Sequence, residues 1–276
     1  MQLEFLNMTE TEQILVAKIG GNVLDHHTES LDFLQKFIKL PYRKILVHGG
    51  GKIATDVASR MGIETKMIDG RRVTDFETLK VATMVYAGWS NKTLVAHLQS
   101  MGVNALGLSG ADLNLIQANK RQIRDIDYGW VGDVSRVFVK RWAFLIENGI
   151  LPVVCAITHD NRGHLLNTNA DTLAAELAMA LSEKYPVKLV YCFEKKGVME
   201  DQNDESTLIR QLSREGFDKY KRTGIISKGM IPKLENAFKA SAKGIKDVYI
   251  CAAQDIGQFQ TSGTQICQSL IPDSIN

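Results

Sequence analysis

Two clusters of glycine follow short apolar runs early in the sequence. Residues 20–21 follow the run at 14–19, and residues 49–51 follow the run at 44–48. Because glycine has no Cβ, successive backbone N–H groups can approach an anion, and a helix that begins just afterwards adds the positive end of its dipole. Lys18 adds a full positive charge at the first turn. The pattern predicts two anion-binding turns and a small phosphorylated ligand.

Composition restricts the class of partner. The chain has 276 residues, of which 45% are hydrophobic, so it can bury a large core as one domain or two lobes. Its 33 basic and 31 acidic side chains give a net charge of +2, which argues against a nucleic-acid-binding surface. No apolar stretch approaches the roughly 20 residues of a membrane span. The sequence therefore predicts no nucleic-acid partner and no membrane partner.

The cysteines indicate a reducing compartment. Four cysteines stand at 155, 192, 251 and 267, without a Cys-x-x-Cys spacing or a close pair. Such a distribution is typical of buried thiols and not of a disulfide framework or a metal site. The N-terminus shows no basic segment followed by an apolar run. We expect a cytoplasmic protein without a protein-bound metal cage.

Strand-like and helix-like segments alternate along the chain. Apolar runs typical of buried strands stand at 14–19, 44–48, 103–108, 150–157, 187–192 and 247–251. A helix is expected from Thr74, with Glu77 completing a capping box. Its apolar stripe through Leu79, Ala82, Val85 and Trp89 is interpreted as core packing. The alternation indicates an α/β fold with a mainly parallel sheet.

One alternative interpretation of the second glycine cluster is a dinucleotide fingerprint. Gly49, Gly51 and Ala54 satisfy Gly-x-Gly-x-x-Gly/Ala, and Asp69 lies at a distance suited to a ribose contact. A nicotinamide-dependent dehydrogenase is thus one hypothesis. The turn follows the second apolar run and not the first, which argues against it. The Walker pattern is absent, because Lys52 follows the glycines directly and precedes Ile53.

Six short segments, taken in order, resemble the amino acid kinase family, and within it the N-acetylglutamate kinases. They are Lys18-Ile19-Gly20-Gly21, His48-Gly49-Gly50-Gly51, Asp69-Gly70-Arg71-Arg72-Val73-Thr74-Asp75, Leu108-Ser109-Gly110-Ala111-Asp112, Asn167-Thr168-Asn169-Ala170-Asp171 and Gly229-Met230-Ile231-Pro232-Lys233. Each segment is weak alone, but the six together span most of the chain. The resemblance implies a three-layer αβα sandwich with an open, mainly parallel central sheet.

The resemblance also implies a reaction. The γ-phosphoryl group of ATP would pass to the γ-carboxylate of an N-acyl-L-glutamate, giving an acyl phosphate in arginine biosynthesis. A carboxylate is ionised at neutral pH, so it needs no general base, and the site must position groups and neutralise charge. By similarity, Lys18 and Lys233 would flank the transferring group. Asp171 would hold both ammonium groups as an organiser and not as a base.

Further residue roles come from the same resemblance. Gly49 and Gly50 would bind the acceptor carboxylate, while Gly20, Gly21 and Gly51 would bind phosphoryl oxygens together with Lys18 and Lys233. Arg72 and Asn167 would hold the substrate's other carboxylate and its acylated amino group. Neighbouring side chains point in different directions, so of Arg71 and Arg72 only Arg72 is expected to reach the ligand. ATP would bring Mg²⁺, held mainly by the nucleotide phosphates.

The acyl group is left open by the sequence. Ala111 stands where family members often carry lysine, so N-succinylglutamate is an alternative to N-acetylglutamate. A larger, charged acyl group would need an additional cation, and the sequence does not identify one.

The organisation of the chain also follows from the resemblance. Residues 1–178 are expected to bind the acyl amino acid and to form a homodimer through the helical region 74–102, and residues 179–276 are expected to bind the nucleotide. Two alternative functions remain: another kinase of the family, similar to aspartokinase or carbamate kinase, and a non-catalytic sensor of an acyl amino acid or arginine.

Overall fold

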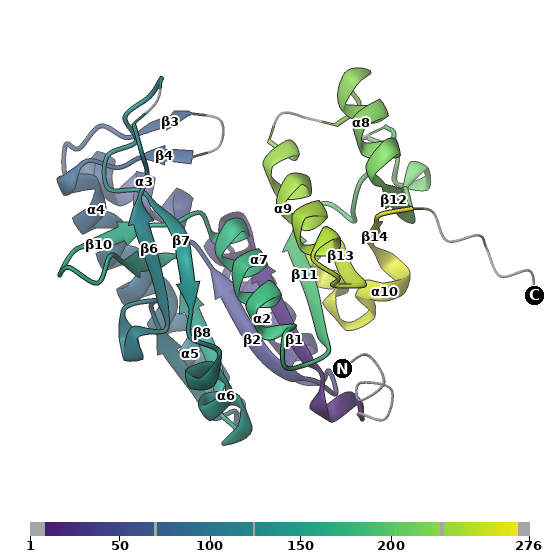
Figure 1. The fold of residues 1–276 in the computed structure, drawn as a ribbon, viewed down its shortest axis with the longest axis horizontal. Helices are drawn as coiled ribbons and strands as arrows, with labels where there is room; N and C mark the ends of the chain where they lie inside the picture. The colour runs from purple at the N-terminus through teal and green to yellow at the C-terminus, as the bar shows by residue number, and fades with distance from the viewer. Residues whose placement is uncertain (1–8, 69–70, 124, 202, 227–228, 270–276) are drawn as a thin grey trace, which may run out of the picture.

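The computed structural model describes residues 9–68, 71–123, 125–201, 203–226 and 229–269. A single large sheet runs through the centre of the molecule (Figure 1). In spatial order its strands are β12 (Gln211–Ser213), β14 (Thr264–Cys267), β13 (Asp247–Ala252), β11 (Val187–Phe193), β1 (Ile14–Ile19), β2 (Arg43–His48), β8 (Leu151–Cys155) and β5 (Ala105–Leu108). Neighbouring strands are parallel except for the antiparallel pair β13–β14. The expected open, mainly parallel sheet is confirmed.

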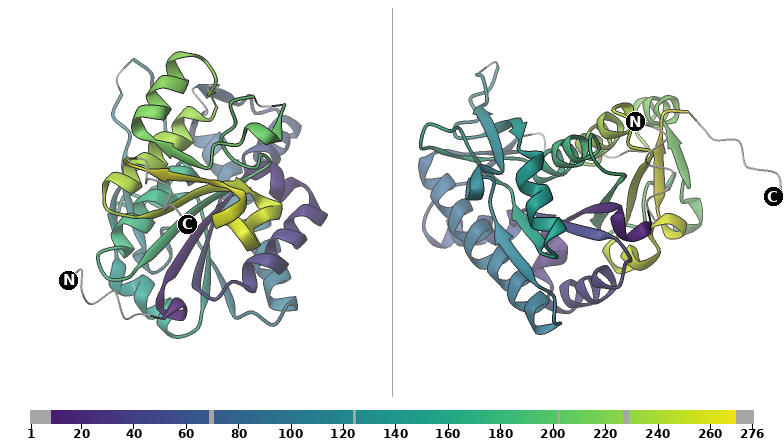
Figure 2. Two further views of the ribbon diagram at one scale, coloured as in Figure 1. Left: turned by 90° about the vertical axis from the view of Figure 1, so that its right-hand side faces the viewer. Right: turned by 60° about the horizontal axis from the view of Figure 1, so that its bottom comes forward.

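Helices cover both faces of this sheet and form the outer layers. They are α1 (Gly21–Asp25), α2 (His27–Ile38), α3 (Gly51–Arg60), α4 (Phe76–Thr83), α5 (Asn91–Ser100), α6 (Val139–Glu147), α7 (Ala170–Leu181), α8 (Arg214–Arg222), α9 (Ile231–Ala242) and α10 (Phe259–Ser262). Along β1, Ile14 and Val16 belong to the core formed with α6, α7 and α9. Leu15 and Ala17 point to the other face, where α2 and α5 pack (Figure 2). β1 is therefore a fully buried strand, as its continuous apolar run predicts.

A smaller sheet and a hairpin flank the carboxyl edge of the large sheet. The smaller sheet has the order β10 (Leu165–Asn167), β9 (Ile157–His159), β6 (Ile116–Lys120) and β7 (Gly132–Val137), and the hairpin pairs β3 (Lys66–Ile68) with β4 (Arg71–Val73). The run predicted as one strand at 150–157 is divided between β8 and β9. This division carries the chain from the large sheet into the smaller one.

The large sheet crosses the expected lobe boundary at residue 178 without a break. β1 and β11 pair along six residues, from Ile14 with Val187 to Ile19 with Cys192. In Figure 1 the part of the chain after this boundary, coloured green to yellow, lies beside the purple to teal part and shares its sheet. The two halves are thus joined by a central strand pair in addition to the chain itself.

Two expectations about the helix after Thr74 are wrong. The N-cap of α4 is Asp75, whose carboxylate accepts a hydrogen bond from Thr78 N at 2.7 Å, so Thr74 is not the cap. Trp89 is 67% exposed and does not belong to the core stripe. The chain is π-helical over Met84–Ser90, and the wider turn changes the 3.6-residue periodicity, so Trp89 rotates outward while Val85 stays buried. All four cysteines are free and buried, as expected.

Candidate active site

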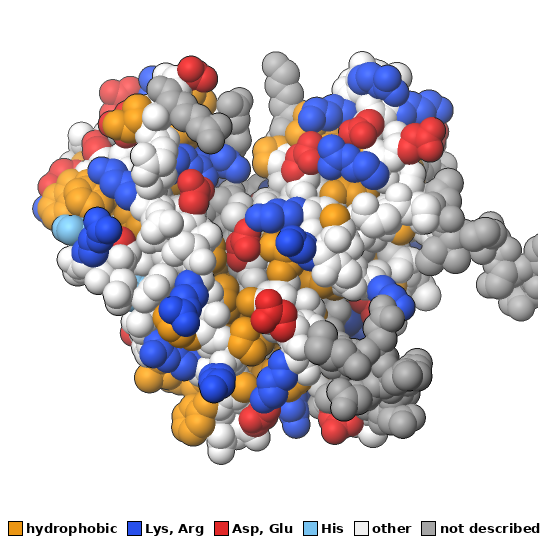
Figure 3. Space-filling model, in the orientation of Figure 1, with side chains coloured by type: hydrophobic (Ala, Val, Ile, Leu, Met, Phe, Trp, Pro, Cys, Tyr) orange, Lys and Arg blue, Asp and Glu red, His pale blue; other side chains and the backbone are white. Residues whose placement is uncertain are grey.

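A cleft of about 200 Å³ lies where the carboxyl ends of β1 and β2 meet the first turns of α3, α7 and α9. Arg71 and nine of the predicted site residues line it. The nine are Lys18, Gly21, Gly49, Gly50, Gly51, Arg72, Asn167, Asp171 and Lys233. In Figure 3 the surface is hollowed between the two halves of the molecule, with lysine and arginine side chains beside the hollow. Residues from both halves of the chain therefore meet at one cationic cleft.

Lys18, Asp171 and Lys233 come together within this cleft. Lys18 Nζ lies 2.7 Å from Asp171 Oδ1, and Lys233 Nζ lies 3.4 Å from Asp171 Oδ2. Lys18 follows Ile14 and Val16 on the face of β1 that α7 covers, and this period of two directs it toward Asp171. Lys233 reaches the same carboxylate from the first turn of α9. One carboxylate thus holds two cations from separate elements.

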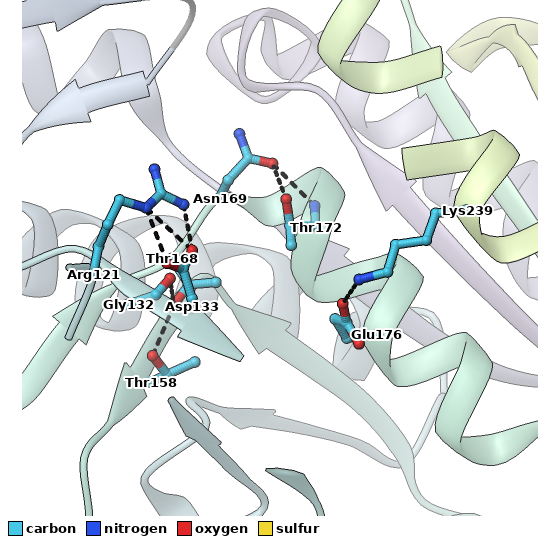
Figure 4. Close-up of polar contacts among 9 residues, drawn as sticks. All are labelled: Arg121, Gly132, Asp133, Thr158, Thr168, Asn169, Thr172, Glu176 and Lys239. Carbon is cyan, nitrogen blue, oxygen red and sulfur yellow. Dashed lines mark hydrogen bonds and ion pairs between the residues drawn. The ribbon is translucent and has the colours of Figure 1, made fainter. Parts of the chain in front are cut away.

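The start of α7 fixes Asp171. The Asn169 side chain accepts a hydrogen bond from Thr172 N at 3.0 Å and so caps the helix (Figure 4). Further along, Lys239 of α9 contacts Glu176 of α7 at 2.5 Å, which joins the two helices (Figure 4). The Tyr191 hydroxyl donates to the backbone carbonyl of Asp171 at 3.1 Å. The capped start of α7 and the hydrogen bond from Tyr191 of β11 both limit the positions that the Asp171 carboxylate can take.

The charge state of Asp171 follows from its surroundings. Burial on its own would raise the pKa of this carboxyl group, but the nearby ammonium groups of Lys18 and Lys233 outweigh burial and hold the pKa below its ordinary value. Asp171 is therefore ionised across the neutral range. It can compensate the cations but offers no proton.

Arg72 presents unused hydrogen-bond donors to the cleft. The side chain is buried, and its Nη2 donates to Gly51 O at 2.6 Å and to Thr55 Oγ1 at 2.8 Å. Its Nε and Nη1 are buried and have no partner among the described residues. A buried guanidinium with two free donors is costly unless an anion completes it. The arrangement suits a ligand carboxylate.

Asn167 lies at the end of β10 and also lines the cleft. Its Nδ2 donates to Thr74 Oγ1 at 3.0 Å, and Thr74 Oγ1 donates in turn to Arg72 O at 3.0 Å. These bonds connect Asn167 to the strand that carries Arg72. The two side chains expected to hold one substrate are therefore held relative to each other.

Four of the five glycines predicted to bind anions line the cleft, and one does not. Gly21, Gly49, Gly50 and Gly51 line the cleft, but Gly20 does not, and its N–H already donates to Cys192 O at 2.9 Å. The expectation that the Gly20 N–H binds a phosphoryl oxygen therefore fails in this structure, because the backbone pairing of β1 with β11 extends to it.

A buried network below the second glycine cluster was not foreseen. The ring of His48 is fully buried, with Nδ1 at 2.7 Å from Gly49 O and Nε2 at 3.0 Å from Asn91 Nδ2. Burial lowers the pKa of His48 to about 4, so the ring is neutral at pH 7. The bonds fit a ring that donates from Nδ1 and accepts at Nε2. His48 thus fixes the carbonyl of the first glycine in the turn.

Three further lining residues were missed or set aside. Tyr86 enters the cleft from the π-helical segment, a type of irregularity that is frequent at functional sites. Arg71 lines the cleft together with Arg72, so both arginines border the space in which a ligand would lie, and the expectation that only Arg72 contacts the ligand stays a prediction. Arg121, at the end of β6, also lines it. Nothing local in the sequence marks Arg121, because the fold brings it to the site from a different sheet.

A second cavity of about 210 Å³ adjoins the cleft on the side of residues 179–276. It is lined by Phe193, Glu194, Lys195, Gly197, Val198, Met199, Ile225, Ile226, Gly229, Met230 and Lys233. Lys233 lines both spaces, so an occupant of the second cavity would extend toward the Lys18–Asp171–Lys233 group.

Among the described residues, no group of three or more His, Cys, Asp or Glu side chains is placed to hold a metal ion. In the same part of the chain no helix has the length and apolar character needed to cross a membrane. Asp69, the ribose contact of the dehydrogenase hypothesis, lies outside the described residues.

Comparisons with known proteins agree on one family. The model of the amino acid kinase family matches residues 13–252. The chain is 50% identical over 255 residues to an acetylglutamate kinase of Bacteroides thetaiotaomicron, covering 92% of this chain and 98% of that protein. It is 49% identical over 255 residues to an acetylglutamate kinase of Parabacteroides distasonis, covering 92% and 99%. Among solved structures, the N-acetylglutamate synthase of Neisseria gonorrhoeae has a similar fold, with a TM-score of 0.80, 23% identity and coverage of 95% of this chain and 61% of that one.

Proposed function

The chain belongs to the amino acid kinase family, and from this premise we propose that it uses ATP to phosphorylate the γ-carboxylate of an N-acyl-L-glutamate. It is a phosphotransferase similar to acetylglutamate kinases, which excludes the dehydrogenase hypothesis. The observation that carries the proposal is the convergence of Lys18 and Lys233 on Asp171 beside an arginine-lined cleft. The product would be an acyl phosphate and the pathway arginine biosynthesis.

The charges of the site suit in-line transfer between two anions. A γ-carboxylate oxygen would form a bond to the γ-phosphorus while the bond from that phosphorus to the β,γ-bridging oxygen breaks, leaving ADP. No proton is removed from the nucleophile, so no general base is needed. Lys18 and Lys233 would neutralise the charge on the transferring group, and Asp171 would keep the two cations from repelling each other.

Substrate recognition would divide along the walls of the cleft. The unpaired Nε and Nη1 of Arg72 would bind the α-carboxylate, and Asn167 would contact the acylated nitrogen. Backbone N–H groups of Gly49 and Gly50 would hold the γ-carboxylate. Those of Gly21 and Gly51 would approach the phosphoryl oxygens.

The second cavity is our candidate for the nucleotide. An occupant's phosphates would lie beside Lys233, and all eleven residues that line the cavity belong to 179–276. Mg²⁺ would enter with ATP and be held chiefly by the phosphates, which requires no dedicated group of protein carboxylates. We therefore keep the division into an acyl-amino-acid lobe at 1–178 and a nucleotide lobe at 179–276.

A homodimer would bury the exposed side of α4 and the π-helical segment. Phe76, Met84 and Trp89 are each more than half exposed, and Phe76 and Met84 line an apolar hollow together with Trp130 and Leu165. A surface of this kind commonly marks a protein interface.

The four cysteines are buried and free, which suits a reducing compartment, so the cytoplasm is the location that we propose.

An ATP-dependent hydroxamate assay tests the reaction, because hydroxylamine traps acyl phosphates. We expect product with an N-acylglutamate and none with free glutamate, which lacks the amide that Asn167 would contact. Binding of these ligands without any ATP-dependent product would contradict the proposal and favour a sensor. Product from aspartate or carbamate alone would favour another kinase of the family.

A further inference from the structure

Two cationic side chains that line the cleft have no role in the proposed reaction. Five cationic side chains line it, and within the described residues Asp171 is the one carboxylate in its lining. Lys18 and Lys233 are assigned to the phosphoryl group, and Arg72 is assigned to the α-carboxylate. Arg71 and Arg121, which we call the outer arginine pair, have no assigned partner. We infer that the acyl group of the substrate carries a carboxylate of its own, as in a succinyl group. This inference rests on the proposed function.

Arg121 lies beside the wall assigned to the acylated nitrogen. Its backbone N donates to Val131 O at 2.8 Å, and Val131 is bridged in turn to Asn167. Arg121 is thus separated from Asn167 by a single segment of chain. A group that extends from an amide held at Asn167 has Arg121 as a near cationic neighbour.

The guanidinium of Arg121 is fixed but incompletely bonded. Its Nε lies 3.2 Å and 3.1 Å from the two Asp133 oxygens, its Nη2 also donates to Asp133, and its plane lies over the Tyr128 ring (Figure 4 shows the pair with Asp133). Its Nη1 is buried and has no partner among the described residues. A guanidinium oriented on one edge by a carboxylate and left free at Nη1 is prepared for a second anion.

Arg71 adds the second member of the pair. It stands at the start of β4 and is partly buried, and its side chain makes no hydrogen bond or ion pair within the described part of the chain. Arg71 and Arg121 line both the cleft and an outer cavity next to it. Asp125 and Asp133 face that outer cavity but do not line the cleft. Asp133 thus pairs with Arg121 from the outer cavity, and within the described residues the cleft that the two arginines share has no carboxylate in its lining other than Asp171.

A dicarboxylic acyl group would satisfy this arrangement, whereas acetyl would not. An acetyl methyl group has no charge or acceptor to offer to the two guanidinium groups. Two methylenes beyond the amide carbonyl, as in succinyl, would bring a carboxylate to the outer arginine pair. The extra cation that the sequence does not reveal is thus supplied by the smaller sheet and the β3–β4 hairpin.

The test compares kcat/KM of the full chain for N-acetyl-, N-succinyl- and N-succinamyl-L-glutamate. The succinamyl group matches succinyl in length and shape but carries no charge. We expect the succinyl compound to exceed both others by about tenfold or more, the effect of one charge-assisted hydrogen-bonded contact. Equal values for succinyl and succinamyl would overturn the inference while leaving the proposed function intact. Absence of acyl phosphate with every compound would overturn the proposed function itself.

Variants locate the effect. Arg121→Met combined with Asp133→Asn removes the cation without leaving Asp133 unpaired, and should lower kcat/KM for the succinyl compound about tenfold with less than a threefold change for acetyl. Arg71→Met should act in the same direction. Arg136→Met, at an exposed arginine of β7 outside the cleft, is the matched control. An equal loss for both substrates in the Arg121 variant would show a structural role and contradict the assignment.

Discussion

At the scale of single residues, Asp171 matters through the two cations that it holds. Its carboxylate is buried between Lys18 and Lys233, and the low pKa keeps it ionised. In the proposed reaction this carboxylate would compensate cations that act mainly when the phosphoryl group moves. Its removal should therefore affect the barrier more than binding.

We expect Lys233→Ala and Asp171→Ala each to lower kcat by about 100-fold or more, with KM for the acyl substrate changed only a few-fold. Steady-state kinetics measure this. Lys239→Ala is the matched control, because Lys239 also joins α9 to α7, through Glu176, away from the cleft. Parallel losses in kcat and in substrate affinity would contradict the assignment.

His48 makes a separate prediction about pH. Its pKa is about 4 in the folded protein and near 6.5 when unfolded, so between these values the unfolded chain binds the extra proton and acidification favours unfolding. Protonation of His48 in the unfolded chain should lower the free energy of unfolding by about 2 kcal/mol between pH 7 and pH 5.

Urea unfolding of the wild type and of His48→Gln at both pH values measures how much unfolding free energy the protonation of His48 removes. The glutamine variant cannot take up that proton, so its loss of stability between pH 7 and pH 5 should be smaller by about 2 kcal/mol. An identical loss in the two proteins would show that the ring is protonated in the fold.

At the scale of elements, the π-helical segment shapes the second glycine turn. A Cβ at Gly50 would lie 2.8 Å from Tyr86 Cδ1 and 3.2 Å from Ser90 Oγ, both of which come from this segment. At Gly51 a Cβ would meet no heavy atom within 4 Å. The two neighbouring glycines thus differ sharply in their tolerance of a side chain.

We expect Gly50→Ala to lower the free energy of unfolding by about 1–3 kcal/mol, because the buried ring of Tyr86 must move. Gly51→Ala, at the first position of α3, should leave it unchanged or raise it by up to about 1 kcal/mol. Chemical denaturation of both variants provides the comparison. An unchanged free energy of unfolding in Gly50→Ala would mean that the π-helical segment moves away from the new Cβ at little cost.

Local sequence patterns predicted the strands better than the helix starts. The run at 14–19 coincides with β1, because a strand buried on both faces is apolar throughout. The cap at Asp75 was missed because Thr74 also fits a capping pattern, yet its hydroxyl is used by Arg72 O and Asn167. Trp89 was misplaced because a π-helix leaves no clear local signature.

The site shows the same division. Lys18, Arg72, Asn167, Asp171 and Lys233 were named from motif resemblance, and the structure brings all five to one cleft, although their roles stay predictions. Arg121 could not be named, because its position depends on how β6 and the segment at Val131 pair. The phosphate-binding role predicted for the Gly20 N–H could not be judged from the sequence, because that N–H donates to Cys192 O in the pairing of β1 with β11.

At the scale of the whole molecule, the exposed apolar side of α4 and the π-helical segment predicts association. For the homodimer proposed above, we expect Trp89→Glu to favour the monomer, because a charge would be buried at the interface. Light scattering coupled to gel filtration measures the mass. Phe144→Glu, at a similarly exposed aromatic side chain on α6, is the control and should leave the mass unchanged.

The strand pair β1–β11 has a consequence for any attempt to separate the halves of the chain. A cut at residue 178 falls inside α7 and would strip β1 and β11 of six paired residues, leaving each fragment with a long unprotected strand edge. Fragments 1–178 and 179–276 should accordingly aggregate when produced singly and become soluble when produced together. The proposed division of ligands between the halves would then operate within one shared sheet, and we expect the two halves to unfold together.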